Sequence, residues 1–231
     1  MITSTSSASL LSQVQINDWV QIGSTIVLSA TAFLAPYIIE RWRSTFRSPK
    51  LKIQFKLEPP DCHQTQMIGP TINYPVYYFR FIVANIGKTQ AEDCEVFLEK
   101  IYKENSAEAM IEIDNFTPIN LKWSGVRDPF KRLIQPGKEM YCDIGRIQHP
   151  DHPFYSVYRN ISEIDKEVNK FIFELPERYY SQWDCLTPGR YKLIISVYSK
   201  NAEKTTKSFG LSWTGRWENN EKDMFNELVI T

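Results

Sequence analysis

Charged residues are absent from one long stretch near the N-terminus of the chain. Between Asp18 and Glu40 lie 21 residues with no Asp, Glu, Lys or Arg. A helix of that length rises about 30 Å, which matches the hydrocarbon layer of a bilayer. A core helix of a soluble protein normally carries charge every few residues on its wet face. The missing charge therefore favours a transmembrane helix, with a core helix as the alternative.

Basic residues are also absent from the first 17 positions. A cleaved signal peptide begins with a basic region, so this absence disfavours cleavage, although residues 30–32 resemble a cleavage site. Basic residues follow the uncharged stretch instead, and by the positive-inside rule that flank lies in the cytoplasm. They are Arg41, Arg43, Arg47, Lys50 and Lys52. We predict a single-pass membrane protein, with an outer tail over 1–18, a span over 19–41, a basic linker over 42–50 and a cytoplasmic domain over 51–231.

Catalytic and metal-binding signatures are scarce. The chain has no G-x-x-x-x-G-K-[ST], G-x-G-x-x-G, G-x-S-x-G or C-x-x-C pattern, and only three histidines. The run Asp61-Cys62-His63 holds reactive groups, but neighbouring side chains on an extended strand point to opposite faces. The run 149–152 carries two histidines and an aspartate, which suit a metal, but Pro150 and Pro153 fit a rigid surface turn better. We predict no enzyme activity, no cofactor and no metal.

Net charge is lacking as well, because 27 basic residues balance 27 acidic ones. No electrostatic field then draws the protein to nucleic acid, and we predict no nucleic-acid partner. The cysteines are few and widely spaced: Cys62, Cys94, Cys142 and Cys185. A cytoplasmic domain would keep them as free thiols. Disulfides remain open if the orientation in the membrane is reversed.

Alternating apolar and polar residues fill much of the chain after residue 50, separated by turn residues. We predict strands over 51–57, 76–84, 96–101, 191–198 and 207–213, with short helices over 161–171 and 218–228. An irregular insertion should occupy the region around 148–186. The inward side chains should include Phe79, Phe81, Val83, Leu193, Ile195 and Val197. The expected fold class is mainly β: an antiparallel immunoglobulin-like β-sandwich preceded by one transmembrane α-helix.

Two segments carry a resemblance to a known family. The first is "YYFRFIVANIGKTQAEDCEVFLEKI", in which a strand ends in Asn-x-Gly and a second strand follows a turn. The second is "LTPGRYKLIISVYSKNAEKTTKSFGLSW", in which Pro-Gly-x-Tyr opens a strand. Both resemble CARDB-type and related immunoglobulin-like sandwich domains. The resemblance implies an adhesion, spacer or interaction module, and it carries over no catalytic residue.

A short sequence pattern that occurs twice suggests a recognition patch. "LKWSGVR" over 121–127 and "LSWTGRW" over 211–217 share the pattern Leu-x-Trp-[Ser/Thr]-Gly. If both repeats lie at one end of the domain, a patch of Trp123, Trp213, Arg216 and Trp217 could bind a partner, because Trp and Arg are frequent interface anchors. The alternative is two strand ends, each capped by a Trp and leaving through a Gly turn.

The uncharged helix also has two different faces. At about 100° per residue, small and polar side chains gather on one of them: Gln21, Thr25, Ser29, Ala32 and Pro36. Small residues let helix backbones approach closely within a membrane. Besides the lipid bilayer itself, we expect this face to meet a second copy in a homo-oligomer or the span of a partner membrane protein. Chance sorting in a plain anchor is the alternative.

Together these patterns predict a membrane-anchored, non-enzymatic β module. It would bind a partner protein or a small ligand at the cytoplasmic face and couple that event to the helix. A purely structural anchor or spacer subunit of a membrane complex is the alternative. A hydrolase that uses the insertion as a lid is a third class, which the missing motifs disfavour.

Overall fold

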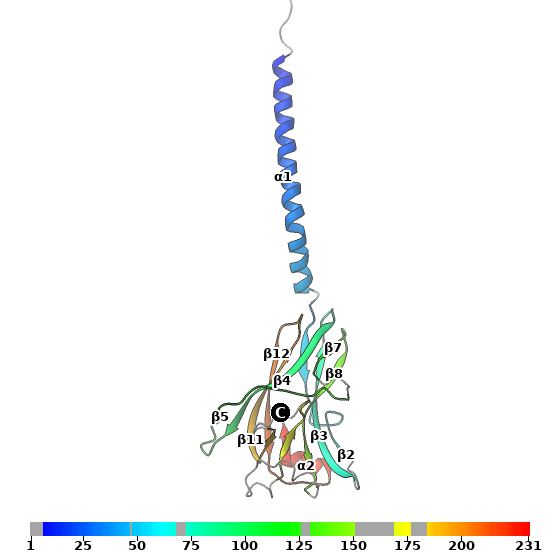
Figure 1. The fold of residues 1–231 in the computed structure, drawn as a ribbon, viewed down its shortest axis with the longest axis vertical. Coiled ribbons are helices and arrows are strands. Elements are labelled where there is room, and N and C mark those ends of the chain that lie inside the picture. The colour runs from blue at the N-terminus through cyan, green and yellow to red at the C-terminus, as the bar shows by residue number, and fades with distance from the viewer. Residues whose placement is uncertain (1–6, 47, 68–72, 126–129, 151–168, 177–183) are drawn as a thin grey trace, which may run out of the picture. The chain divides into compact units, whose positions relative to one another are not determined.

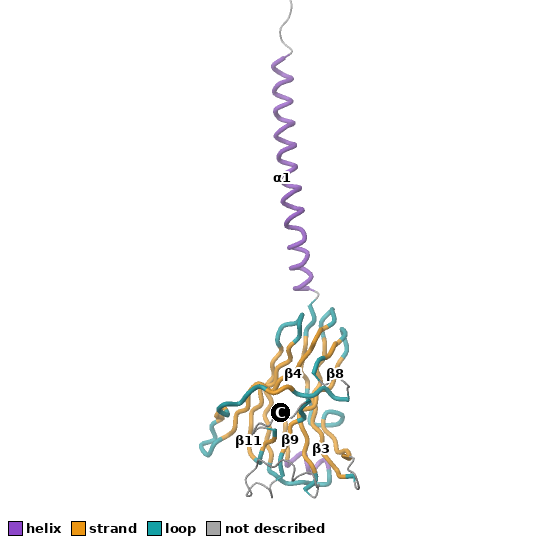
Figure 2. The backbone as a smooth tube through the Cα atoms, in the orientation of Figure 1, coloured by secondary structure: helices purple, strands orange, loops and turns teal. Residues whose placement is uncertain are grey.

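The computed structural model describes residues 7–46, 48–67, 73–125, 130–150, 169–176 and 184–231. The chain divides into two compact units, residues 1–48 and 49–231 (Figure 1). The first contains a single helix, α1, and the second is mainly antiparallel β structure (Figure 2). The predicted combination of one N-terminal helix with a β-rich remainder is therefore confirmed.

Helix α1 runs from Ser7 to Phe46, over 40 residues. It begins earlier than the predicted span, and its stretch Gly23–Arg41 is long and apolar enough to cross a membrane. None of that stretch is buried in the protein. The alternative of a helix packed in the core of a soluble domain finds no support, because the described side chains of α1 from residue 23 to residue 41 are all exposed.

The second unit contains two antiparallel sheets. The six-stranded sheet has the order β1-β3-β8-β9-β10, with β2 also paired to β3. Its strands are β1 (Leu51–Gln54), β2 (Cys62–Met67), β3 (Tyr74–Asn85), β8 (Glu139–Gln148), β9 (Phe171–Phe173) and β10 (Cys185–Leu186).

The seven-stranded sheet has the order β13-β12-β11-β4-β5, with β6 and β7 also paired to β4. Its strands are β4 (Ala91–Glu104), β5 (Met110–Glu112), β6 (Ile119–Asn120), β7 (Arg132–Ile134), β11 (Gly189–Tyr198), β12 (Thr205–Trp213) and β13 (Leu228–Ile230). A short helix, α2 (Glu221–Glu227), precedes β13, and the Asn220 side chain caps it by accepting from the N–H of Lys222.

The two sheets share one hydrophobic core. Side chains alternate between the two faces of a strand, so every second residue of β3 and β11 points inward. All six predicted inward residues of these strands are buried, which confirms that prediction. The Phe81 ring on β3 and the Phe209 ring on β12 lie 5.8 Å apart between centroids and join the sheets.

The two lateral edges of the core differ. On one side, the segment after β6 bonds to both sheets: Leu121 N–H donates to Val96 O at 2.8 Å, and Asp143 N–H donates to Lys122 O at 2.8 Å. On the other side, β1 meets the first half of β12 through a side chain, with the Thr205 hydroxyl donating to Leu51 O at 3.2 Å. No β ladder joins β1 to β12 among the described strands, so this edge is the more open one.

Several predicted boundaries are wrong. The strand predicted over 51–57 ends at Gln54, and a strand that was not predicted, β2, follows it. Residues 218–228 form a shorter helix, because Leu228 already pairs with Trp213 in the sheet. Within the region around 148–186, the described residues include β9 and β10, which extend the six-stranded sheet. Most of the helix predicted over 161–171 lies outside the described residues.

Candidate functional site

The predicted face of α1 consists of exposed side chains whose hydroxyl groups are already hydrogen bonded. Gln21, Thr25, Ser29, Ala32 and Pro36 are all exposed. The Thr25 hydroxyl donates to Gln21 O at 2.8 Å, and the Ser29 hydroxyl donates to Thr25 O at 2.8 Å. Each hydroxyl donor is thus satisfied within the helix. Thr25 and Ser29 therefore offer a second helix small size rather than free donors.

Pro36 adds an acceptor to the same face. Proline has no N–H, so the carbonyl four residues earlier, that of Ala32, receives no helical hydrogen bond at this position. In hydrocarbon an unsatisfied carbonyl is costly, and a polar donor on a neighbouring helix would relieve that cost.

The predicted Trp and Arg patch is wrong for two of its four members. Trp123 and Trp213 are 0% and 2% exposed, so neither can contact a partner. Each indole N–H donates to a backbone carbonyl inside the domain: Trp123 to Cys94 O at 3.2 Å and Trp213 to Asn169 O at 2.9 Å. These tryptophans fill the core.

The other two members of the predicted patch lie after β12. Arg216 is exposed, whereas Trp217 is half-buried against the Tyr77 and His149 rings, at 4.9 and 5.1 Å between centroids. Trp217 therefore packs on the end of the six-stranded sheet, and only Arg216 is left fully accessible. The structure does not bring the four residues together as one surface.

The open edge carries a different candidate site, formed around an arch that interrupts the edge of the six-stranded sheet. After β1 the chain leaves the sheet at Phe55, whose ring packs edge-on against Phe209 at 5.8 Å. It turns at Glu58-Pro59-Pro60, where Asp61 N–H donates to Glu58 O at 3.0 Å. Prolines lack a donor and fit such a turn better than a continued strand. The chain then rejoins the sheet as β2.

Asp61 and Arg80 hold the arch in place. The Asp61 side chain is buried, and its Oδ2 accepts from Lys56 N–H at 2.9 Å across the arch. Arg80 Nε donates to Pro60 O at 2.9 Å, and its guanidinium lies 4.4 Å from the centroid of the Tyr141 ring. Burial raises the pKa of the Asp61 carboxyl, while the Lys56 N–H and the Arg80 charge act to lower it.

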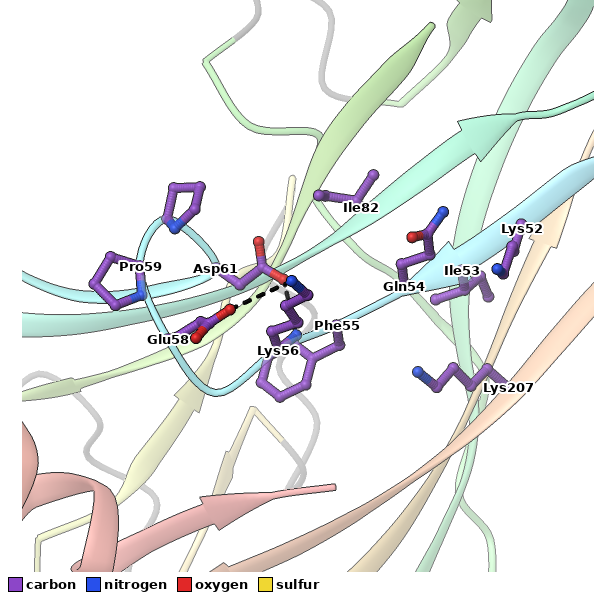
Figure 3. Close-up of a pocket in the computed structure, with 11 residues that line it drawn as sticks. Lys52, Ile53, Gln54, Phe55, Lys56, Glu58, Pro59, Asp61, Ile82 and Lys207 are labelled. Atoms are coloured by element: carbon purple, nitrogen blue, oxygen red, sulfur yellow. Dashed lines mark hydrogen bonds and ion pairs between the residues drawn. The ribbon is translucent and has the colours of Figure 1, made fainter. Parts of the chain in front are cut away.

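A cleft of about 390 Å³ lies beside this arch, between β1 and β12 (Figure 3). Its apolar wall is formed by Ile53, Phe55 and Ile82. Lysines from three segments surround it: Lys52 of β1, Lys56 of the arch and Lys207 of β12. We refer to this feature as the lysine cleft.

Among the described residues, only one of the three lysines at the lysine cleft has an ion-pair partner. Lys56 Nζ is 3.4 Å from the Glu58 carboxylate, which is an exposed pair of small energetic value. Lys52 and Lys207 have no ion-pair partner in the described part of the chain. The Lys207 ammonium lies 4.9 Å from the centroid of the Phe209 ring. Ammonium groups above an apolar wall suit a ligand that carries carboxylate or phosphate oxygens.

The cysteine beside this cleft is not a reactive nucleophile. Cys62, directly after Asp61, is fully buried, and desolvation together with the Asp61 charge raises the pKa of its thiol far above the usual range. A thiol held protonated is neither a nucleophile nor a metal ligand. The described residues contain no group of three His, Cys, Asp or Glu side chains that could hold a metal ion, although Asp151 and His152 lie outside them.

Sequence reasoning missed the lysine cleft. The Pro-Pro turn followed by Asp61 was visible as a break, but nothing local indicated that Lys207 lies opposite Lys52. That proximity depends on how the two sheets stack, which is a long-range property. The four cysteines are all free thiols.

The comparisons with known proteins leave the family open. No protein-family model matches the chain. No curated protein matches it at a significant level. Among solved structures, it is similar to the X-ray structure of Northeast Structural Genomics Consortium target SoR45, at 12% sequence identity and a TM-score of 0.28. That similarity covers 76% of this chain and 94% of the other. At such a score it supports no argument about fold or function.

Proposed function

We propose that the protein is a single-pass membrane protein whose β domain is a non-enzymatic binding module on the cytoplasmic side. The module binds a partner protein or a small ligand through the lysine cleft and couples that event to the membrane helix. The observation that carries the proposal is the pair of unmatched ammonium groups, Lys52 and Lys207, at an apolar cleft on the open edge. The partner should present carboxylate or phosphate groups there.

Support for the membrane anchor comes from the length and apolar character of Gly23–Arg41 and from the exposure of its side chains. Support for the cytoplasmic side comes from the basic residues that follow the span. The paired sheets with a shared core agree with an immunoglobulin-like sandwich, which is the fold that the CARDB-type resemblance implies. The small-residue face of α1 is proposed to contact another membrane helix.

A photo-crosslinking experiment in native membranes tests the binding role. A benzophenone amino acid at Lys207 should give a specific adduct, and the same group at Lys192, exposed on β11, should not. Lys52→Glu should reduce the adduct at position 207, because a like charge then repels an anionic partner. Lys222→Glu serves as the charge control, because Lys222 is an exposed residue of α2 that does not line the cleft.

The same experiment separates the two non-enzymatic roles. A structural anchor or spacer needs no ligand in the cleft, so it predicts equal, background crosslinking at positions 207 and 192. That result would reject the binding role and leave the spacer role. Resistance of the protein to alkaline carbonate extraction tests the membrane anchor separately.

A further inference from the structure

Asn85, the last residue of β3, draws three segments of the β domain together at one end. It is 0% exposed, and its side-chain amide is fully used. The Oδ1 atom accepts from Lys50 N–H at 3.3 Å and from Gly87 N–H at 3.0 Å. The Nδ2 atom donates to Thr89 O at 2.8 Å and to Ile134 O at 2.9 Å. A buried amide with all its hydrogen bonds made fixes its surroundings firmly.

The Asn85 backbone extends this connection to the turn between β7 and β8. Its N–H donates to Lys138 O at 3.0 Å, and its carbonyl accepts from Gly137 N–H at 2.8 Å. The neighbouring Ile86 N–H donates to Lys50 O at 2.8 Å. Lys50, the turn 86–89 and the turn 135–138 therefore form one surface, which we call the Asn85 end.

The Asn85 end exposes one aliphatic side chain among unpaired lysines. Ile86 is 62% exposed although it directly follows a buried strand. Lys50, Lys88 and Lys138 are exposed, and none has an ion-pair partner within the described residues. By contrast, Lys200 lies 3.7 Å from the Glu92 carboxylate. Three lysines without an ion-pair partner among the described residues therefore gather on this surface.

An aliphatic side chain surrounded by ammonium groups suits the headgroup region of an anionic bilayer. The aliphatic group enters the boundary between headgroups and acyl chains, and the lysines meet lipid phosphates and carboxylates. The cytoplasmic leaflet carries such anionic lipids. Glu139, next to Lys138, is an exposed acidic residue that opposes this attraction, and the three lysines outnumber it.

The position of this surface in the sequence points to the same ligand. Lys50 follows Phe46, the last residue of α1, by four positions. Arg41 and Arg43 lie within the last turns of α1, so the basic residues at the end of the helix continue in sequence into the Asn85 end. This continuity in the sequence favours a ligand at the membrane surface over a partner in solution.

We propose that the Asn85 end binds anionic phospholipid headgroups of the leaflet next to the C-terminal end of α1, with Ile86 inserted among them. This inference rests on the proposed membrane anchor. The contact restrains the orientation of the β domain on the membrane and leaves the lysine cleft free for its own partner.

The test uses the full chain in nanodiscs of phosphatidylcholine, with or without phosphatidylserine. A benzophenone amino acid replaces Ile86, and in a matched control it replaces Met110, an exposed apolar residue of the edge strand β5. After irradiation, lipid adducts are measured by mass spectrometry. We expect adducts at position 86, mainly with phosphatidylserine, and background yield at position 110.

Charge variants show whether the lysines recognise the lipid. Lys88→Gln and Lys138→Gln should each lower the phosphatidylserine adduct at position 86 about fivefold, the equivalent of ~1 kcal/mol for one basic residue near an anionic surface. Lys192→Gln should leave it unchanged. Equal adduct yields at positions 86 and 110, or equal yields with and without phosphatidylserine, would overturn the inference.

Incorporation of the chain into nanodiscs distinguishes the lipid contact from the proposed membrane anchor. A chain that enters nanodiscs but gives no lipid adduct at position 86 rejects the lipid contact and leaves the anchor intact. A chain that does not enter nanodiscs at all rejects the anchor and the lipid contact together.

Discussion

The Asp61 carboxylate accepts a hydrogen bond from the backbone N–H of Lys56 at 2.9 Å, across the arch that separates β1 from β2. This bond fixes the position of Lys56 and with it one wall of the lysine cleft. Asp61 is only 4% exposed, so loss of its carboxylate removes an acceptor that lies largely inside the domain. The shape of the cleft therefore depends on this hydrogen bond and on the adjoining one from Arg80 Nε to Pro60 O.

Removal of that carboxylate should destabilise the domain. Asp61→Ala leaves the Lys56 N–H without its acceptor, and we expect the free energy of unfolding to fall by about 1–3 kcal/mol. Glu58→Gln breaks only the exposed pair with Lys56 and should change it by less than about 0.5 kcal/mol. Urea unfolding of the purified full chain in detergent, followed by tryptophan fluorescence, measures both. Equal effects of the two variants would contradict the role given to Asp61.

A second buried carboxyl predicts an unusual pH dependence. Burial raises the pKa of Asp143, although the Ser124 hydroxyl and nearby basic residues act to lower it. A carboxyl with a raised pKa binds its proton more tightly in the folded chain than in the unfolded one. The contribution of Asp143 to stability therefore grows as the pH falls from the raised folded pKa towards the unfolded value near 3.8.

The variant Asp143→Asn isolates this effect, because asparagine does not titrate. The stability of the natural protein relative to Asp143→Asn should increase as the pH is lowered through that window, by about 1.4 kcal/mol for each unit of pKa elevation. Ser124→Ala removes a hydrogen bond of 2.5 Å that favours the ionised form, so it should enlarge the increase. Urea midpoints from neutral pH down to the unfolded value near 3.8 measure the trend. A pH-independent difference between the two proteins would show that the pKa of Asp143 is not raised.

The strands were predictable where a local pattern determines them. In β3 and β11 the alternation of apolar and polar residues agrees with the burial of every second side chain, so the pattern identified both strands and their inward residues. Strand β2 has no such pattern, because its residues Cys62–Met67 are mostly polar. It is a strand because β3 is long enough to pair with β1 at one end and β2 at the other, which only the tertiary structure reveals.

The candidate sites were less predictable for two different reasons. The Trp pattern was visible, but Leu211 and Trp213 are two positions apart on β12 and share its inward face. Leu121 and Trp123 have the same spacing in the segment after β6, and both are buried. Since both leucines are apolar, that spacing already favoured burial of the tryptophans over a surface patch. The lysine cleft and the Asn85 end depend instead on residues far apart in sequence, and no local signal joins them.

The orientation in the membrane is testable with an engineered thiol. Cys62, Cys94 and Cys142 are buried and would not react from either side, so a reporter is needed at an exposed position. Lys192→Cys, in a background with Cys185→Ser, should remain unlabelled by an impermeant maleimide in intact cells and react after lysis. Ser4→Cys in the tail should label in intact cells. Labelling of position 192 in intact cells would reverse the proposed topology.

The exposed face of α1 provides the sharpest test of helix association. Because the Ser29 hydroxyl donates to Thr25 O within the helix at 2.8 Å, its contribution to a helix pair should come from small size and not from a hydrogen bond. Ser29→Ala should therefore preserve association in a membrane two-hybrid assay. Ser29→Leu and Ala32→Leu should weaken it severalfold, because a larger side chain separates the backbones and denies a partner access to the Ala32 carbonyl. Ile26→Leu should have no effect. If Ser29→Ala disrupts association as strongly as Ser29→Leu, the second helix recognises the hydroxyl group and not the small volume of Ser29. If no variant has an effect, the helix is a plain anchor.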